Sequence, residues 1–188
     1  MAAVLGLGNP GDQYSGTRHN IGKNAVAGLI ERLGLRLEPG RGEFVFAGDP
    51  DRDLILAYNT TFMNLSGISA LDIVERFEIE PGELLVVCDD FNLPFGALRI
   101  RRSGGDGGHN GLGSIIAQLG TEEFPRLRIG IGPVPEGVDA ADFVLSEFAS
   151  GERQHLPAIA LAAADALLAV FTDGLDRAMS VHNRRVVE

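Results

Sequence analysis

The side chains of this sequence that could do chemistry are an imidazole, a carboxylate and several amides, all placed at expected turns. His19 closes a glycine-rich opening stretch, Asp89 directly follows a short apolar run, and Asn9 follows the first apolar run of the chain. A histidine can take a proton from water while a carboxylate keeps the imidazole in the right tautomer. Amides can donate hydrogen bonds to a carbonyl oxygen or to its oxyanion. These residue types predict hydrolysis of an ester or an amide.

Other polar residues stand at equivalent points of the chain. Asn64 follows an expected hairpin, and Asp90 lies beside Asp89. His109 and Asn110 follow an expected edge strand. Ligands of α/β sheets gather at the carboxyl ends of strands, so we expect these groups to share one pocket. Each residue taken alone could simply form a turn or cap a helix. For there to be no shared pocket, however, that simpler explanation would have to be true of every one of these residues at once, so we favour the pocket.

A zinc site is one alternative use of the same groups. His19, His109 and Asp89 could supply three ligands. The sequence has no closely spaced pair of ligands, however, and amides, which are poor zinc ligands, dominate the set. We therefore expect no metal.

The glycines at positions 6, 8 and 11 offer a second alternative, the GxGxxG signature of a dinucleotide-binding loop. In that fold the third glycine lies in the first turn of a helix whose N-terminus faces the pyrophosphate. Here Gly11 is followed by a polar segment without helical periodicity, and a helix is expected only from Asn20. The glycines instead predict tight turns that set Asn9 and His19 at one pocket, and no cofactor is expected.

Short apolar runs alternate with helical periodicities, which is typical of an α/β protein. Strands are expected over 2–7, 43–47, 54–58, 84–88, 97–101 and 127–131. Helices are expected over 20–33, 65–77, 112–119, 140–148, 156–171 and 175–181, with Asn20 and Asn64 as the first two caps. A turn signal between 43–47 and 54–58 indicates a hairpin. We expect one globular domain over 1–188, an α/β fold with a twisted mixed sheet sandwiched between helices.

Composition limits the remaining function classes. The chain has 188 residues and a formal net charge of −10, which argues against indiscriminate binding to nucleic acid or anionic membranes but permits a local basic site. Lys23 is the only lysine, so almost all positive charge is arginine, whose planar fork suits phosphate. Cys88 is the only cysteine, and we find neither a membrane-spanning stretch nor a signal-type segment. A cytoplasmic protein is expected.

Four long motifs carry a resemblance to a known family. They are "GLGNPGDQYSGTRHNIG" (6–22), "NTTFMNLSG" (59–67), "DDFNLPFGALRIRRSGGDGGHNGLGSI" (89–115) and "RLRIGIG" (126–132). In order and spacing they resemble the bacterial peptidyl-tRNA hydrolases, and the similarity continues through "FVLSEF" (143–148) and "FTDGLDRAM" (171–179). The resemblance therefore covers nearly the whole chain and is far more specific than a GxGxxG pattern.

The resemblance implies a mixed α/β globule, a monomer, no metal or cofactor, and hydrolysis of the ester that joins a peptide to the 3′ end of tRNA. It implies that His19 is the general base, that Asp89 supports it, and that Asn9 separates peptidyl from free aminoacyl substrates. Further positions match residues that contact the substrate or the tRNA end: Tyr14, Phe62, Asn64 and Asn110. Two more match basic positions that engage tRNA phosphate: Arg101 and Arg128.

A non-catalytic RNA-binding module on the same scaffold is the second hypothesis. Such a binder would need the arginines but not the His19 base, and the sequence keeps both, which favours the enzyme. Arg99 and Arg101 alternate along one expected strand and should face the same side. Arg128 could join them from another strand, whereas Arg102 should point away.

Overall fold

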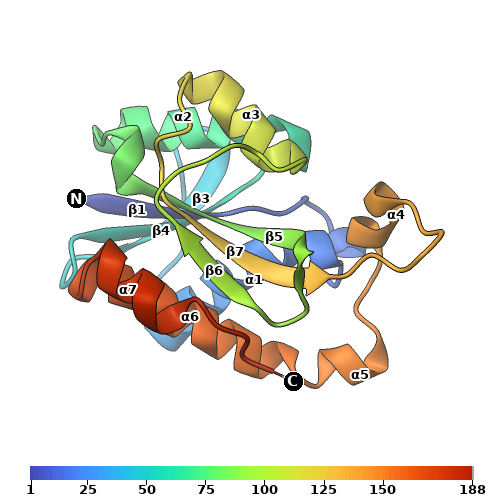
Figure 1. The fold of residues 1–188 in the computed structure, drawn as a ribbon. Coiled ribbons are helices and arrows are strands. Elements are labelled where there is room, and N and C mark those ends of the chain that lie inside the picture. The colour runs from blue at the N-terminus through green and yellow to red at the C-terminus, as the bar shows by residue number, and fades with distance from the viewer. Residues whose placement is uncertain (188) are drawn as a thin grey trace.

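A mixed β-sheet forms the centre of the molecule in the computed structural model, which describes residues 1–187 (Figure 1). Within those residues the sheet has seven strands in the order β2-β3-β4-β1-β5-β7-β6. The strands are β1 (Ala2–Gly6), β2 (Glu38–Pro39), β3 (Phe44–Asp49), β4 (Leu54–Asn59), β5 (Leu84–Pro94), β6 (Leu98–Arg101) and β7 (Arg126–Gly132). Strands β4, β1, β5 and β7 run parallel, and both edges of the sheet are antiparallel. The predicted mixed α/β fold is confirmed.

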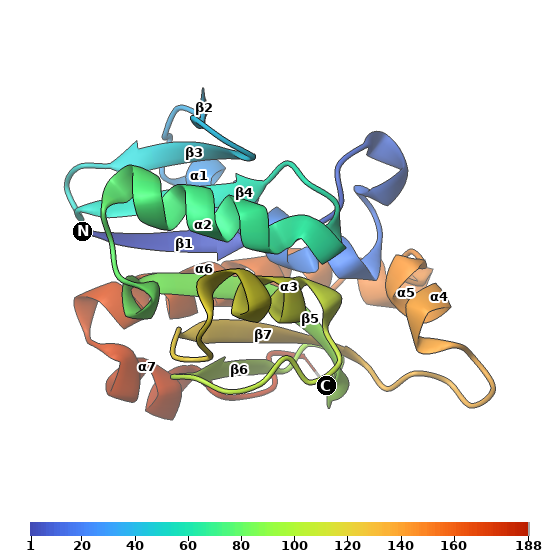
Figure 2. The ribbon, with the colours of Figure 1, turned by 90° about the horizontal axis from the view of Figure 1, so that it is seen from above.

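Helices cover both faces of this sheet (Figures 1 and 2). One face carries α2 (Ser66–Phe77) and α3 (Asn110–Leu119), and the other carries α1 (Ile21–Arg32), α6 (Leu156–Thr172) and α7 (Leu175–His182). Two short helices, α4 (Ala140–Leu145) and α5 (Ser150–Arg153), lie beyond the end of the sheet. None of the helices in residues 1–187 has the length and apolar character needed to cross a membrane.

Strand β1 shows why the sheet needs two helical layers. Its central residues are all fully buried, with Val4 in the apolar cluster on the α1 and α6 face and Leu5 in the cluster on the α2 and α3 face. A parallel strand covered on both faces is apolar on both faces, which is why the sequence has a continuous apolar run here instead of an alternating one.

Strand β5 is longer than the sequence predicts, and this corrects the expected position of the two aspartates. Asp89 and Asp90 lie inside the strand and not after its end, because β7 continues beside them, pairing Asp89 with Ile129 and Asp90 with Gly130. On its other side β5 loses its neighbour earlier, since β1 ends at Gly6 opposite Val87. On the β1 side, therefore, no strand within residues 1–187 pairs with β5 at Asp89.

Three smaller expectations about helices need correction. Asn64 does not cap α2, because it lies inside a 3₁₀ turn (Met63–Leu65) that precedes the helix. Asn20 occupies the cap position of α1, but its side chain bonds elsewhere and makes no capping hydrogen bond. The expected helix over 140–148 ends at Leu145, where the Ser146 hydroxyl donates to the Phe143 carbonyl at 2.6 Å and competes with helix continuation.

The segment after α7 lies along the outer edge of β6. Leu98 N–H donates to the Arg184 carbonyl at 2.8 Å, and Val186 N–H donates to the Gly96 carbonyl at 2.9 Å. The Asn183 side chain accepts from Ile100 N–H at 2.6 Å and donates to the Ile100 carbonyl at 3.2 Å. The backbone groups of this edge strand are thus satisfied by the chain's own C-terminal segment.

Candidate active site

A cavity of about 550 Å³ opens at the end of β1, between the loop after that strand, β5, α3 and α4. It is lined by seven of the residues singled out in the sequence: Asn9, Tyr14, His19, Phe62, Asn64, Asp89 and Asn110. His109 also lines it, whereas Arg101 and Arg128 do not. The structure therefore brings these residues together at one cavity, but the expectation was wrong for Asp90, whose side chain contacts Arg128 instead.

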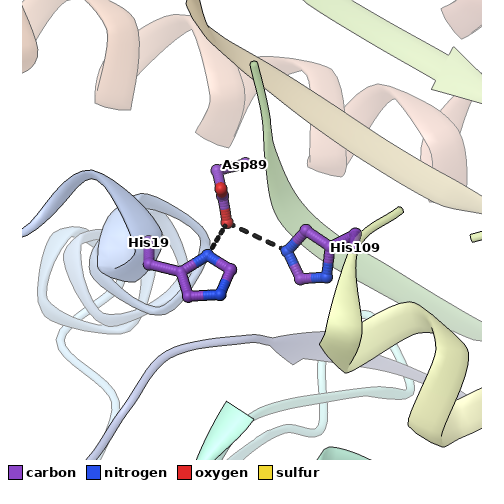
Figure 3. A group of neighbouring side chains, drawn as sticks. All are labelled: His19, Asp89 and His109. Atoms are coloured by element: carbon purple, nitrogen blue, oxygen red, sulfur yellow. Dashed lines mark hydrogen bonds and ion pairs between the residues drawn. The ribbon is translucent and has the colours of Figure 1, made fainter. Parts of the chain in front are cut away.

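Asp89 lies between two histidines, both of which point at the same carboxylate oxygen (Figure 3). The Nδ1 atom of His19 is 2.8 Å from Asp89 Oδ1, and the Nε2 atom of His109 is 3.0 Å from it. The two rings lie 5.0 Å apart between centroids, and all three residues are buried. Because an ionised carboxylate only accepts hydrogen bonds, His19 must carry its proton on Nδ1, which leaves Nε2 with a free lone pair.

His109 is held in one tautomer from both sides of its ring. It is the N-cap residue of α3, and its Nδ1 accepts from the backbone N–H groups of Gly111 at 3.1 Å and Leu112 at 3.2 Å. An Nδ1 that accepts a hydrogen bond carries no proton, so Nε2 is the ring nitrogen whose N–H donates to Asp89. The helix cap therefore fixes the direction of the second hydrogen bond to the carboxylate.

These contacts keep the Asp89 carboxyl ionised despite its burial. Burial by itself would raise the pKa of this carboxyl, but electrostatic attraction by His109 and the hydrogen bonds from His109 and His19 outweigh it, and the pKa lies well below its usual range. Two converging N–H donors thus provide the stabilisation that water would give an exposed carboxylate.

The turn that carries His19 packs closely on β5. A Cβ atom on Gly22 would collide with the Val87 carbonyl, so a glycine is required for this approach. On the outer side, the guanidinium of Arg18 forms a two-point ion pair with Glu152 at 2.9 and 2.6 Å and lies over the Phe143 ring. The imidazole is thereby fixed between the sheet and the α4–α5 segment.

Two buried asparagines hold the loop that carries Asn9. The Asn20 amide accepts from Asn9 N–H at 2.7 Å and donates to the Asn9 carbonyl at 2.9 Å. The Asn59 amide binds Gly8 in the same two-sided way, at 3.0 and 2.9 Å. Asn9 Oδ1 then accepts from Met63 N–H at 2.8 Å, so its amide nitrogen is left to donate toward the cavity.

The cavity also has apolar lining residues. Tyr14 and Phe62 meet edge to face with ring centroids 6.3 Å apart, and Phe62 is half exposed. Val144 and Leu145 of α4 contribute aliphatic surface. The buried polar groups Asn9, His19 and Asp89 therefore share the cavity with apolar side chains, as in many small-molecule sites.

The basic residues lie on one face of the sheet but outside the cavity. Arg99 and Arg101 are the two exposed residues of β6 and share a face, as predicted. Arg128 of β7 pairs directly with Arg99, so it is on that face too, where it donates to Asp90 at 3.2 Å. Arg102 forms an ion pair with Asp176 of α7 on the opposite side of the sheet.

The two histidines and Asp89 also have the residue types of a metal site. One ligand atom from each residue lies within 4.8 Å of the others. The atoms that would coordinate are the ones already hydrogen-bonded to one another, His19 Nδ1, His109 Nε2 and Asp89 Oδ1. The geometry thus suits a hydrogen-bonded triad, and the expected absence of a metal stays a prediction.

Comparison with known proteins agrees with this site. The profile of the family described as peptidyl-tRNA hydrolase matches residues 3–188. A peptidyl-tRNA hydrolase of Chloroflexus aurantiacus is 46% identical over 186 residues, covering 97% of this chain and 99% of its own. One from Sulfurihydrogenibium is 43% identical over the full length of both chains. The crystal structure of the peptidyl-tRNA hydrolase of Acinetobacter baumannii superposes with a TM-score of 0.88 at 30% identity, covering 100% of this chain and 97% of its own.

The chain belongs to the peptidyl-tRNA hydrolase family. This confirms the resemblance seen in the sequence motifs. The dinucleotide alternative does not fit, because Gly11 leads into a short 3₁₀ turn (Asp12–Tyr14) and α1 begins only at Ile21. The RNA-binding module is not favoured either, since the relatives are named as hydrolases.

Some supporting residues of this peptidyl-tRNA hydrolase site escaped the sequence analysis. Asn59 was absent from the expected set and Asn20 was assigned to a helix cap, yet both hold the Asn9 loop. Asn59 is the first residue of the motif "NTTFMNLSG", and its only signal is that a polar residue ends an apolar strand. His109 was expected in the pocket, but its bond to Asp89 was not.

Proposed function

We propose that this protein hydrolyses the ester bond between a peptide and the 3′ end of tRNA, with His19 as general base. The observation that carries the proposal is the His19–Asp89 pair at 2.8 Å, which leaves His19 Nε2 free beside a cavity that also holds the Asn9 amide. This is the arrangement that general-base hydrolysis requires, a base oriented by a carboxylate next to a hydrogen-bond donor for the carbonyl.

The proposed reaction needs only water and these side chains. His19 Nε2 takes a proton from water while the water oxygen attacks the ester carbonyl carbon, and the positive imidazolium is stabilised by the Asp89 carboxylate. The oxyanion of the tetrahedral intermediate accepts a hydrogen bond from the Asn9 amide. The intermediate then breaks its bond to the ribose 3′ oxygen, which takes the proton back from His19. A free carboxylic acid and the tRNA 3′ hydroxyl leave.

The remaining predicted residues have roles in binding. Asn64 and Asn110 line the cavity and are placed to hydrogen-bond the substrate, while Tyr14 and Phe62 offer aromatic surface in its lining. Asn9 is also proposed to separate peptidyl from free aminoacyl esters, because its amide NH2 has two N–H donors, and the one not used by the oxyanion can donate to the amide carbonyl of an N-blocked residue.

A cavity of about 550 Å³ accepts the ester end of the substrate but not the body of a tRNA. The tRNA must therefore bind the surface outside, where we propose that Arg101 and Arg128 contact phosphate. We further propose that the protein acts as a monomer, as the family resemblance implies, and that it acts in the cytoplasm, because peptidyl-tRNA arises during translation.

The direct test is release of N-acetylated amino acid from acylated tRNA, assayed with and without a chelator. We expect release in both conditions and little from the same tRNA carrying an unblocked amino acid. Absence of release from the N-blocked substrate would overturn the proposed function. Activity that disappears with the chelator and returns with added zinc would replace the general-base mechanism with a metal-assisted one.

A further inference from the structure

A second hollow, of about 430 Å³, lies at the opposite side of β6 from β7. Four arginines line it: Arg99, Arg101, Arg184 and Arg185. We refer to it as the arginine groove. It is built from two chain segments 83 residues apart, since Ile100 of β6 is bonded to the side chain of Asn183. The positive charge therefore gathers only through the fold.

None of these four arginines forms an ion pair with another residue in 1–187, although acidic residues outnumber basic ones by 26 to 16 in the chain. Neighbouring arginines behave differently: Arg102 pairs with Asp176 and Arg128 pairs with Asp90. Four like charges around one hollow repel one another, and an anion bound among them would relieve that repulsion. The groove thus has the charge distribution of an anion-binding site.

The backbone on both sides of the groove is fixed. Ala97 and Arg185 form an antiparallel bridge, and Leu98 N–H donates to the Arg184 carbonyl at 2.8 Å. Arg99 and Arg101 project from a strand that is paired with β7 along its length. The arginine side chains are exposed, and Arg185 alone among them hydrogen-bonds to residues in 1–187, donating from Nε to the Phe95 carbonyl at 3.3 Å, so a ligand can be bound without refolding of the edge.

We propose that the arginine groove binds phosphodiester groups of the tRNA backbone, at a point separate from the cavity that takes the ester end. This inference rests on the proposed function, because tRNA is then the polyanion presented to the protein. Guanidinium forks bind phosphate oxygens in a two-point geometry that a lysine cannot offer.

The position of the groove suits a substrate that extends from the cavity. Arg99 pairs in register with Arg128, and Arg128 contacts Asp90, the neighbour of Asp89. A continuous row of arginine side chains on one sheet face thus leads from the residue next to the catalytic carboxylate to the C-terminal segment. A tRNA with its 3′ end in the cavity can follow this row.

An acidic protein segment fits the groove less well than RNA. Tight protein interfaces are anchored by aromatic or aliphatic side chains in desolvated pockets. The large apolar residues at the groove, Leu93 and Leu98, are buried in the protein, and no aromatic residue lines it. Charge without an apolar anchor favours a polyanion whose binding depends on phosphate contacts.

The test uses the full chain with Arg184→Ala and Arg185→Ala combined. Its Kd for deacylated tRNA is measured from about 50 to 300 mM salt, roughly the range over which phosphate contacts dominate binding. We expect the Kd to rise several-fold at low salt. The slope of log Kd against log salt should become shallower by about one for each arginine that contacts a phosphate. A second variant, Arg184→Glu combined with Arg185→Ala, reverses one charge as well as removing the other and should weaken binding further.

Arg41→Ala is the matched control, since Arg41 is exposed, makes no ion pair with residues in 1–187, and lies between β2 and β3 at the other edge of the sheet. It removes one exposed arginine charge, against two in the combined groove variant, and should leave Kd and slope unchanged. Thermal melting checks that each variant is folded. Wild-type Kd and slope in the folded groove variants would overturn the proposal. Because deacylated tRNA needs no hydrolysis, this outcome is distinct from failure of the ester assay.

Discussion

The cavity and the arginine groove use charged side chains in opposite ways. At the cavity, Asp89 is buried and its oxygen is hydrogen-bonded to two histidines. At the groove, Arg184 and Arg185 are exposed and have no acidic partner in residues 1–187. The interactions of buried, hydrogen-bonded groups depend on geometry and are little weakened by salt. The interactions of exposed charges reach over longer distances and are screened by salt.

This difference separates two tasks of a tRNA-directed hydrolase. Breaking the ester requires that the base be held to within a fraction of an ångström, which burial and fixed tautomers provide. Holding a large polyanion requires many weak contacts that adjust to it, which flexible exposed arginines provide. Changes at the cavity should therefore alter kcat, and changes at the arginines should alter KM and its salt dependence.

The largest effect is expected for His19→Ala. Loss of a general base lowers the rate by roughly 10²- to 10⁴-fold, and kcat for release of N-acetylated amino acid should fall accordingly. The Kd for deacylated tRNA should stay at the wild-type value, because His19 lines the cavity and lies outside the arginine groove. Turnover near the wild-type rate in a purified sample would mean that another group is the base.

Asp89→Asn should lower kcat by about 10²-fold or more, because an amide can offer its own N–H to the ring and favour the wrong tautomer. Asp90→Asn is the control: Asp90 contacts Arg128 and the Asn92 backbone but neither histidine, so kcat should change little. Equal losses in the two variants would contradict the role assigned to Asp89.

The same variant also tests the low pKa of Asp89. A carboxyl whose pKa is lower in the folded than in the unfolded state contributes stability above the unfolded pKa, about 3.9, and loses it as the pH falls below. The difference in unfolding free energy between wild type and Asp89→Asn should therefore shrink as the pH falls below about 4. Thermal or urea unfolding across this range measures it. A difference that shrinks already between pH 7 and 6 would contradict the lowered pKa.

Substitution of His109 distinguishes its two contacts. His109→Ala removes both the α3 cap and the hydrogen bond to Asp89, and should cost about 1 kcal/mol of stability and about tenfold in kcat. Asparagine is a good cap residue, so His109→Asn should recover stability without recovering kcat. Recovery of both by asparagine would show that the cap alone matters.

The smallest effects are expected for Arg101→Ala and Arg128→Ala. Each should raise KM for full-length peptidyl-tRNA several-fold and make the salt dependence of binding shallower by about one phosphate contact. Saturating turnover should be nearly unchanged, and an N-blocked ester on a short CCA oligonucleotide should be insensitive to both. Wild-type Kd and salt slope in both variants would place the tRNA on a different face.

Much of the fold and the cavity could be predicted because local pattern and tertiary structure agree there. The apolar run of β1, the hairpin signal between β3 and β4, and the periodicity of α2 all match the elements observed. The expectation that strand ends meet at one edge of a sheet then brought His19 and Asp89 together.

What the sequence could not provide depends on partners distant along the chain. The extension of β5 beyond Cys88 requires β7 beside it, because "DDFNLP" is rich in Asp, Asn and Pro, which are depleted in strands. Asn59 acts through a backbone 51 residues away, so its own neighbours carry no sign of that role. The groove needs Arg184 beside β6, through a polar segment that has no strand pattern at all.

The division between chemistry and tRNA binding can be tested on the wild-type protein by one salt titration. Two quantities are measured: the single-turnover rate constant for release of N-acetylated amino acid at saturating protein, and the Kd for the same peptidyl-tRNA. Both are followed from about 50 to 300 mM salt, roughly the range where phosphate contacts dominate binding. We expect Kd to rise steeply with salt while the rate constant stays within about twofold, because the buried His19–Asp89 pair is little screened. A rate constant that falls in parallel with binding would contradict the separation of the two regions.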